Sequence, residues 1–324
     1  MFHLLPLTTF LLIQRVLSTP LSTPDPLPLV IWHGLGDQHD AEGLHSVGDL
    51  AKETNPGTFV YYIRIDDDGG NDRTATFFGN LTLQLQKVCD DLASHPILST
   101  APAINGLGFS QGGQFLRGYV ERCNNPPVHN LVTLGSQHNG IAQYQTCGAT
   151  DWFCKGWQAL LRGNTWSNYV QSHLVPAQYY RSVNETTGEA SEEYLEHSNF
   201  LADVNNEREE KNATYAKNLA SLENLVMYMF EDDVTVIPKE SGWFAQVNAT
   251  SEEVTWLKDR TIYKEDWIGL KKLDEKGGLR FDTMPGGHMT LGDEDLKNMF
   301  AKWFAPPKTS WVQALNQVQE IVEL

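Results

Sequence analysis

Short apolar runs along the chain alternate with segments in which apolar residues recur every three or four positions. The continuous runs predict buried strands at residues 27–32, 58–65, 104–107, 128–134, 225–230 and 278–281. Helical spacing is found at residues 42–53 and 76–93, and again after residue 110. Strands that alternate with helices are typical of a mainly parallel sheet. The sequence therefore predicts an α/β fold with helices on both faces of a central sheet.

Residues 140–206 depart from this alternation, because their apolar residues lie on short, irregular pieces. The aromatic residues of this region are Tyr144, Trp152, Phe153, Trp157, Trp166, Tyr169, Tyr179, Tyr180 and Phe200. Large apolar side chains on such pieces either cover the sheet or line a groove for an apolar ligand. We interpret the region as a helical insertion before the late strands, and both roles stay open at this point.

The two ends of the chain differ in pattern from the part between them. Residues 1–19 hold an apolar core followed by small residues, which is typical of a secretory signal peptide. At the other end, Pro306 and Pro307 precede residues 309–324, where helical spacing predicts a tail helix. Residues 20–308 are therefore expected to form one domain.

The charge balance excludes some classes of partner. The chain has 24 Lys and Arg residues against 41 Asp and Glu residues, a formal net charge of −17. An acidic surface repels phosphate backbones and anionic lipid headgroups, so nucleic acid is not an expected partner. No run of about 18 apolar residues follows the first segment, so stable membrane insertion is not expected either.

Four cysteines fit a secreted protein with disulfides, and they allow three pairings. Cys147 and Cys154 would close a short loop, and Cys89 and Cys123 each lie near the end of a helical pattern. We favour the pairs Cys89–Cys123 and Cys147–Cys154, with free buried thiols as the alternative. N-glycosylation sequons, which fit the same compartment, begin at Asn80, Asn184, Asn212 and Asn248.

The strongest chemical signal is the segment Gly108-Phe109-Ser110-Gln111-Gly112, which follows an apolar run and precedes a helical pattern. A serine between two glycines at a strand-to-helix turn is typical of a nucleophile elbow, which exposes the hydroxyl. The backbone N–H of Gln111, at the start of the helix, can donate to an oxyanion. The alternative is an ordinary glycine-rich turn, so the partners of Ser110 decide between the two.

Those partners follow in the order Ser, acid, His that an α/β-hydrolase requires. Glu231, Asp232 and Asp233 come directly after a late strand, and spacing alone does not choose among them. Only His288 lies after this acid among the candidate histidines.

Before the elbow, the glycine-bearing loop after the first strand offers the N–H of Leu35 as a second oxyanion donor. This chemistry needs no metal and no cofactor. The three aspartates at residues 66–68 are interpreted as a solvated turn because a calcium loop requires a different spacing.

Several segments together resemble the palmitoyl-protein thioesterases, lysosomal α/β-hydrolases that remove fatty acyl groups from cysteine. The similar segments lie within residues 28–304, at 28–37, 108–123, 135–140, 200–208, 233–244 and 287–288. The resemblance departs after Asp37, where the family has two adjacent cysteines and this chain has Gln38 and His39.

The resemblance implies an α/β-hydrolase fold and a role for each site residue. Ser110 would be the nucleophile, His288 the general base and Asp233 the orienting acid, with Leu35 and Gln111 as oxyanion donors. It implies the same cysteine pairs and an acyl groove formed by the insertion at 140–206. The implied substrates are proteins or peptides with a long-chain S-acyl group, and a sorting receptor is a further expected partner.

The expected function is hydrolysis of that thioester in the secretory pathway, in a lysosome or vacuole, with release to the outside as the alternative. Two other functions stay open. One is a secreted carboxylic-ester hydrolase or lipase with the same three residues. The other is a catalytically dead hydrolase-fold protein that binds lipid or a receptor.

Overall fold

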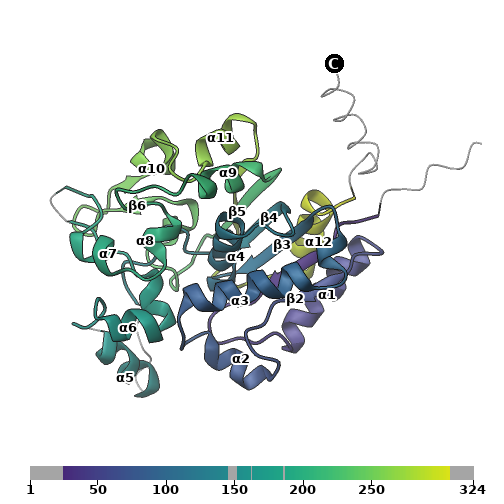
Figure 1. Ribbon diagram of the computed structural model, residues 1–324, viewed down its shortest axis with the longest axis horizontal. Coiled ribbons are helices and arrows are strands. Elements are labelled where there is room, and N and C mark those ends of the chain that lie inside the picture. Colours follow the sequence, from purple (N-terminus) through teal and green to yellow (C-terminus); the bar gives the residue numbers. More distant parts are fainter. Residues whose placement is uncertain (1–24, 145–151, 162, 185–186, 307–324) are drawn as a thin grey trace, which may run out of the picture. The chain divides into compact units, whose positions relative to one another are not determined.

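Six parallel strands form the central sheet of the computed structural model (Figure 1). Across the sheet they are ordered β2 (Val60–Tyr62), β1 (Leu29–Trp32), β3 (Ile104–Phe109), β4 (Val128–Leu134), β5 (Asn224–Phe230) and β8 (Leu279–Met284). Every residue of β1 and β3 is buried. A parallel sheet is covered on both faces, which explains why its strands are continuous apolar runs in the sequence. The predicted parallel sheet is confirmed.

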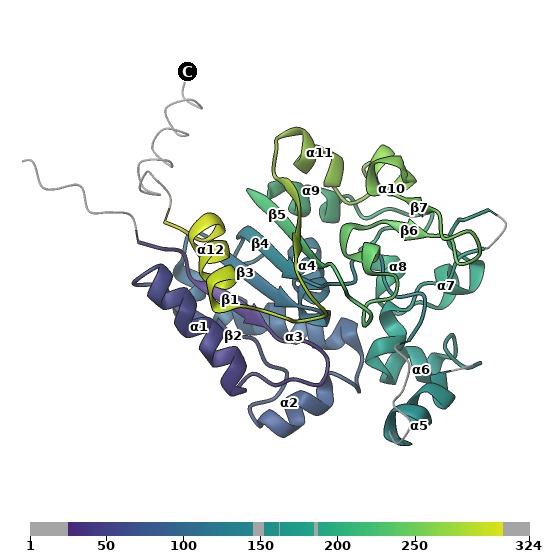
Figure 2. The same ribbon diagram turned by 180° about the vertical axis from the view of Figure 1, so that it is seen from behind.

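Helices cover both faces of this sheet, as Figures 1 and 2 show from opposite sides. One face carries α1 (Glu42–Thr54) and α12 (Asp293–Trp303), whose apolar residues share one core cluster. The other face carries α3 (Leu81–Ser94), α4 (Gln111–Arg122), α9 (Ala213–Ser221) and α11 (Leu270–Glu275). This is the predicted α/β-hydrolase architecture.

The structure describes residues 25–144, 152–161, 163–184 and 187–306. The predicted signal peptide at 1–19 and the predicted tail helix at 309–324 lie outside these residues. In the described part of the chain, no helix is both long and apolar enough to cross a membrane.

Two excursions from the sheet precede its late strands. Between β4 and β5 lie α5 (Trp152–Leu161), α6 (Asn168–His173), α7 (Glu192–His197) and α8 (Leu201–Val204), within the predicted insertion. Between β5 and β8 lie the antiparallel pair β6 (Gln246–Val247) and β7 (Val254–Thr255), and α10 (Thr261–Lys264). Both figures show β6 and α10 beside α7 and α8. The second excursion is absent from the sequence prediction. Short 3₁₀ helices lie at Leu98–Thr100, Val175–Tyr179, Lys239–Trp243 and Leu257–Asp259.

The expected helix at 76–93 is wrong at its start, because α3 begins only at Leu81. A separate helix that the sequence analysis did not predict, α2 (Gly69–Ala75), precedes it, directly after the exposed aspartates at 66–68. Side-chain caps set both boundaries. The Asp68 carboxylate accepts a hydrogen bond from the Asn71 N–H at 2.9 Å, and Asn80 Oδ1 accepts one from the Thr82 N–H at 3.0 Å. Such caps satisfy the first N–H groups of a helix and so fix where it starts.

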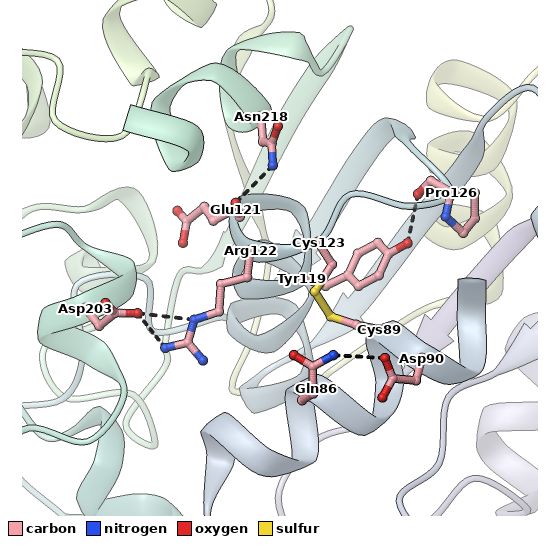
Figure 3. Close-up of a disulfide and its surroundings, with 10 residues drawn as sticks. All are labelled: Gln86, Cys89, Asp90, Tyr119, Glu121, Arg122, Cys123, Pro126, Asp203 and Asn218. Carbon is pink, nitrogen blue, oxygen red and sulfur yellow. Dashed lines mark hydrogen bonds and ion pairs between the residues drawn. A yellow bond between two sulfur atoms is a disulfide. The ribbon is translucent and has the colours of Figure 1, made fainter. Parts of the chain in front are cut away.

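A disulfide joins Cys89 of α3 to Cys123 at the end of α4, with the two Cα atoms 6.0 Å apart (Figure 3). This confirms one predicted pair. The bridged residues are separated by 34 positions, a span that contains β3, Ser110 and all of α4. Closing a loop of this length stabilises a fold by about 4 kcal/mol in the chain-entropy account. The other predicted pair, Cys147–Cys154, lies outside the residues whose side chains are described.

Candidate active site

Ser110 stands at the turn between β3 and α4 in a strained backbone conformation. Its φ is 49° and its ψ is −119°, values that a residue with a side chain rarely adopts. A methyl group on Gly108 would collide with the backbone of Gly113, and one on Gly112 would collide with the carbonyl oxygens of Trp32 and His33. The glycines therefore allow β1, β3 and α4 to approach closely enough to form this turn.

Three residues from distant parts of the chain meet at this turn. His288 Nε2 lies 3.0 Å from Ser110 Oγ, and His288 Nδ1 lies 2.7 Å from Asp233 Oδ2. Asp233 follows β5, and His288 lies between β8 and α12. Because β3, β5 and β8 are parallel, their carboxyl ends reach the same edge of the sheet. The three side chains form a continuous chain of hydrogen bonds from carboxylate to hydroxyl.

Asp233 is the one acid of its group that is buried, whereas Glu231 and Asp232 are exposed. Its Oδ1 accepts hydrogen bonds from the N–H groups of Thr235 and Val236, at 2.8 and 3.0 Å. Burial alone would raise the pKa of Asp233, but the hydrogen bond and charge of His288 and the two N–H groups outweigh it, so the pKa lies below its usual value. Asp233 is therefore a carboxylate that faces the imidazole.

The two predicted oxyanion donors come from different parts of the chain, one before Ser110 and one directly after it. Gln111 is the first residue of α4, and Leu35 lies in the loop after β1. A Cβ on Gly34 would lie only 3.3 Å from Ser110 Cβ, so this loop runs directly beside the serine. In the described part of the chain, no acceptor is bonded to the N–H of Leu35 or Gln111. Both N–H groups are available to a ligand.

Asp72 anchors the loop that carries Leu35, a role that the sequence analysis missed. Its side chain is fully buried, and its Oδ2 lies 2.9 Å from His33 Nε2, 2.9 Å from the His39 N–H and 3.1 Å from His39 Nδ1. Its Oδ1 accepts a hydrogen bond from the Ile65 N–H at 2.7 Å. Burial alone would raise the pKa of Asp72, but these hydrogen bonds lower it to about 2. Both ends of the loop, at His33 and His39, are thus tied to one carboxylate.

The other candidate histidines are placed elsewhere. His138 is buried, lies 2.9 Å from Thr133 Oγ1 and stacks on Phe244. His173 stacks on Tyr169 at the surface, His129 lies in β4 and His197 ends α7. Within the described ranges, no three His, Cys, Asp or Glu side chains are grouped so that they could hold a metal ion.

A cavity of about 720 Å³ opens at Ser110 and His288. The insertion contributes Ile141, Tyr144, Pro176 and Tyr179 to its wall. Further apolar residues come from α1, from the segment before α12 and from α12 itself, namely Leu44, Val47, Leu50, Leu291 and Leu296. The volume lies within the range of ligand pockets, about 300–1,000 Å³. The site can therefore hold a large apolar group next to the serine.

The aromatic residues of the insertion divide between the cavity and the core. Tyr144 and Tyr179 line the cavity, whereas Phe200 is fully buried and Tyr169 is exposed. Trp166 and Tyr180 pack against each other, with ring centroids 5.9 Å apart. The side chains of Trp152, Phe153 and Trp157 lie outside the described residues.

The four sequon asparagines differ in accessibility. Asn184 and Asn212 are exposed, and Asn80 and Asn248 are half-buried. Asn80 also exchanges hydrogen bonds with Asn199 while it caps α3. Attachment of glycans stays a prediction, and Asn184 and Asn212 are the most accessible of the four.

Comparisons with known proteins show which family this chain is similar to. Residues 28–288 match the family described as palmitoyl protein thioesterase. Palmitoyl-protein thioesterase 1 of Caenorhabditis elegans is 36% identical over 278 residues, which cover 85% of this chain and 91% of the relative. Palmitoyl-protein thioesterase 3 of Dictyostelium discoideum is 33% identical and covers 83% and 87%. Human lysosomal thioesterase PPT2 is 27% identical and covers 80% of each chain.

Proposed function

Because the chain belongs to the palmitoyl protein thioesterase family, we propose that it hydrolyses the thioester of proteins or peptides that carry a long-chain acyl group on cysteine. The observation that carries this proposal is the hydrogen-bonded series Asp233, His288 and Ser110 at the mouth of an apolar cavity. Ser110 is the nucleophile, His288 the general base and Asp233 the orienting acid. Leu35 and Gln111 supply the oxyanion donors.

The first half of the reaction forms an acyl-enzyme. Neutral His288 accepts the Ser110 proton through Nε2 while Oγ attacks the thioester carbonyl. The negative charge that develops on the carbonyl oxygen is stabilised by the N–H groups of Leu35 and Gln111, and one such donor contributes about 3 kcal/mol. The carbon–sulfur bond then breaks, and the imidazolium returns its proton to the cysteine sulfur that leaves.

The second half releases the fatty acid. A water molecule gives a proton to His288 and attacks the acyl carbonyl of Ser110, and the serine leaves with that proton. In each half, Asp233 keeps Nδ1 protonated and stabilises the positive charge on the ring. Its lowered pKa means that it stays ionised down to acidic pH, as this role requires.

The cavity is proposed as the acyl-chain site. Its apolar wall includes Tyr144 and Tyr179 of the insertion together with Val236, which follows Asp233. A chain buried there gains about 0.8 kcal/mol per CH₂ group removed from water. Long acyl groups are therefore expected to bind more tightly than short ones.

Cleavage of a palmitoyl-cysteine peptide, compared with the oxygen ester of the matching serine peptide, tests the proposed reaction. We expect fast cleavage of the thioester and slow cleavage of the ester, measured as kcat/KM for each. Equal rates would favour a carboxylic-ester hydrolase. If folded protein cleaved neither substrate, a lipid-binding role would replace the enzymatic one.

The proposed place of action is the secretory pathway, ending in a lysosome or vacuole. The Cys89–Cys123 disulfide, the exposed asparagines Asn184 and Asn212 of two sequons and the lysosomal relatives support it. Glycosidase-sensitive protein in a lysosomal or vacuolar fraction is the expected observation, and unglycosylated protein in the cytosol would contradict it.

The variant Asp72→Asn is expected to lower kcat on the order of 10- to 100-fold with little change in KM. The amide would keep the volume but lose the charge that holds His33 and His39, so the Leu35 N–H would shift from its place beside Ser110, and displacements of about 1 Å have effects of this size. Asp67→Asn is the matched control, because Asp67 is exposed and bonds only Arg64 among the described residues. Steady-state kinetics on the thioester peptide measure the effect.

The pH dependence of unfolding supplies a second measurement on the same variant. Because folding lowers the pKa of Asp72 to about 2, its carboxylate stabilises the fold above the unfolded pKa near 4, by about 2 kcal/mol. This stabilisation is lost as the pH falls from about 4 to about 2. The stability difference between wild type and Asp72→Asn should shrink over that interval.

For the kinetic comparison, an equal loss of kcat in Asp67→Asn and in Asp72→Asn would contradict the positioning role of Asp72.

A further inference from the structure

A second cavity, of about 260 Å³, lies outside the active site. Its wall combines Arg181 and Glu207 from the first excursion with Gln246 and Arg260 from the second. None of these residues lines the cavity at Ser110. The proposed hydrolysis leaves this polar space without a role.

The buried charges at this cavity do not balance. Arg181 and Arg260 are 7% and 9% exposed, and Glu207 is 8% exposed, so two guanidinium groups share one buried carboxylate. Glu207 is committed to Arg181, whose Nε lies 3.1 Å from each carboxylate oxygen. Arg260 has no carboxylate within ion-pair distance among the described residues. One buried positive charge is left over, and such a charge is costly unless an anion meets it.

Arg260 keeps free donors at the cavity. Its Nη1 donates to Asn139 Oδ1 at 2.6 Å and to the Phe244 carbonyl at 2.5 Å. Its Nε and Nη2 have no acceptor in the described part of the chain, and neither atom is sealed inside the protein. Burial, followed by the charge of Arg181, lowers the pKa of Arg260 to about 10, so the group remains charged. Nε and Nη2 form the fork with which arginine binds two oxygens of one anion.

Two exposed carboxylates at the rim, Asp259 and Glu189, limit which anion can enter. Neither lies within 4.0 Å of the Arg260 guanidinium, and water screens both. Their charges repel an extended polyanion more strongly than a single small oxyanion. Thr261 adds a polar group to the same wall, whereas the Gln246 amide already bonds Arg181 and the Gly188 carbonyl.

We propose that this cavity binds one tetrahedral oxyanion, a phosphate or sulfate group, either free or as the monoester of a small hydroxyl compound. Arg260 holds it through Nε and Nη2, beside the ion pair of Arg181 and Glu207. The bound anion would add a second link between the two excursions, which Arg181 Nη1 already joins by donating to Gln246 Oε1 at 3.0 Å. This site is independent of the proposed reaction at Ser110.

The occupied site would also stabilise the wall of the active-site cavity. The Arg181 N–H donates to the Ile141 carbonyl at 2.9 Å, and the Ile141 N–H donates to the Tyr179 carbonyl at 3.0 Å. Ile141 and Tyr179 both line the cavity at Ser110. These two backbone hydrogen bonds therefore connect Arg181, at the anion site, to the wall of the proposed acyl site.

Thermal unfolding of the full chain, titrated with sodium phosphate or sodium sulfate against sodium chloride at equal ionic strength, tests the proposal. The unfolding midpoint should rise with the logarithm of phosphate or sulfate concentration once the dissociation constant is exceeded, and not with chloride. Arg260→Gln should abolish this rise. Arg280→Gln, which removes one exposed charge that does not line the cavity, should retain it.

Isothermal titration calorimetry of the wild-type protein keeps the proposal testable if Arg260→Gln does not fold. One binding site for inorganic phosphate is expected. Weaker binding in Arg260→Lys, which keeps the charge but loses the fork, is expected as well. Glycerol 3-phosphate separates the two sources, because tighter binding than inorganic phosphate identifies a monoester and weaker binding a free oxyanion. Absence of any heat with phosphate and sulfate, or an unchanged rise of the midpoint in folded Arg260→Gln, would overturn the proposal.

Discussion

Ser110→Ala is expected to lower kcat for thioester hydrolysis by about 10⁶-fold, while the protein stays folded and continues to bind the acyl chain. The loss is this large because the variant has no atom that can form the acyl-enzyme, and His288 then has no hydroxyl to deprotonate. Stability should change little, since the small alanine side chain would occupy the same strained turn. The measurement is kcat on a palmitoyl-cysteine peptide, with circular dichroism to verify folding.

Ser46→Ala is the matched control for this variant. Ser46 lines the same cavity, but its hydroxyl donates to the Glu42 carbonyl of its own helix at 3.0 Å and contacts no residue of the proposed triad. Its kcat should stay within a few-fold of wild type. A serine-directed fluorophosphonate should label wild type and Ser46→Ala, but not Ser110→Ala. Residual turnover of Ser110→Ala near the wild-type level would reject the acyl-enzyme mechanism.

The elbow could be predicted from the sequence because its signals are local. The flanking glycines, the apolar run before Ser110 and the helical pattern after it lie within about 20 residues, and each reflects a steric requirement of the turn. The sheet was predictable for a related reason. Its strands are buried on both faces, so runs such as Leu29–Trp32 and Asn224–Phe230 consist almost entirely of residues that favour the interior.

The anchor of the oxyanion loop could not be found in the same way. Asp72 lies 39 positions from His33 in the sequence, and its neighbours Asn71 and Arg73 give no sign that its side chain is buried. It lies in α2, a seven-residue helix that the hydrophobic pattern did not predict. Arg260 is a similar case, because its partners Asn139 and Phe244 come from two separate excursions. Such contacts are tertiary, and hydrophobic periodicity does not report them.

The choice among Glu231, Asp232 and Asp233 lies between these cases. Resemblance to the family selected Asp233, whereas spacing left all three open. The structure shows a local reason as well: the Asp233 side chain accepts from the backbone N–H two residues ahead, at Thr235. Asp232 is also an aspartate and could form such a turn equally well, so this contact could not be predicted from the sequence.

Asp233→Asn is expected to lower kcat by about 10⁴-fold. An amide at this position is neutral and can donate to Nδ1, which would leave the proton of the neutral ring on Nε2. His288 Nε2 could then no longer accept the Ser110 proton, and the positive ring that forms later would lose its counter-charge. Asp232→Asn is the matched control: the neighbouring carboxylate is exposed and lies outside the His288 contact. Its kcat should stay near that of wild type.

The stability of the same pair of variants separates the charge of Asp233 from its shape. Folding lowers the pKa of Asp233, so its carboxylate stabilises the fold above the unfolded pKa near 4, and this contribution is lost as the pH falls through the lower folded value. The difference in unfolding free energy between wild type and Asp233→Asn should therefore be full at neutral pH and decline below about pH 4. A difference that did not change with pH would assign the effect to lost packing. Equal losses of kcat in Asp232→Asn and Asp233→Asn would contradict the role of one oriented carboxylate. They would show that His288 responds to the total negative charge at this edge of the sheet.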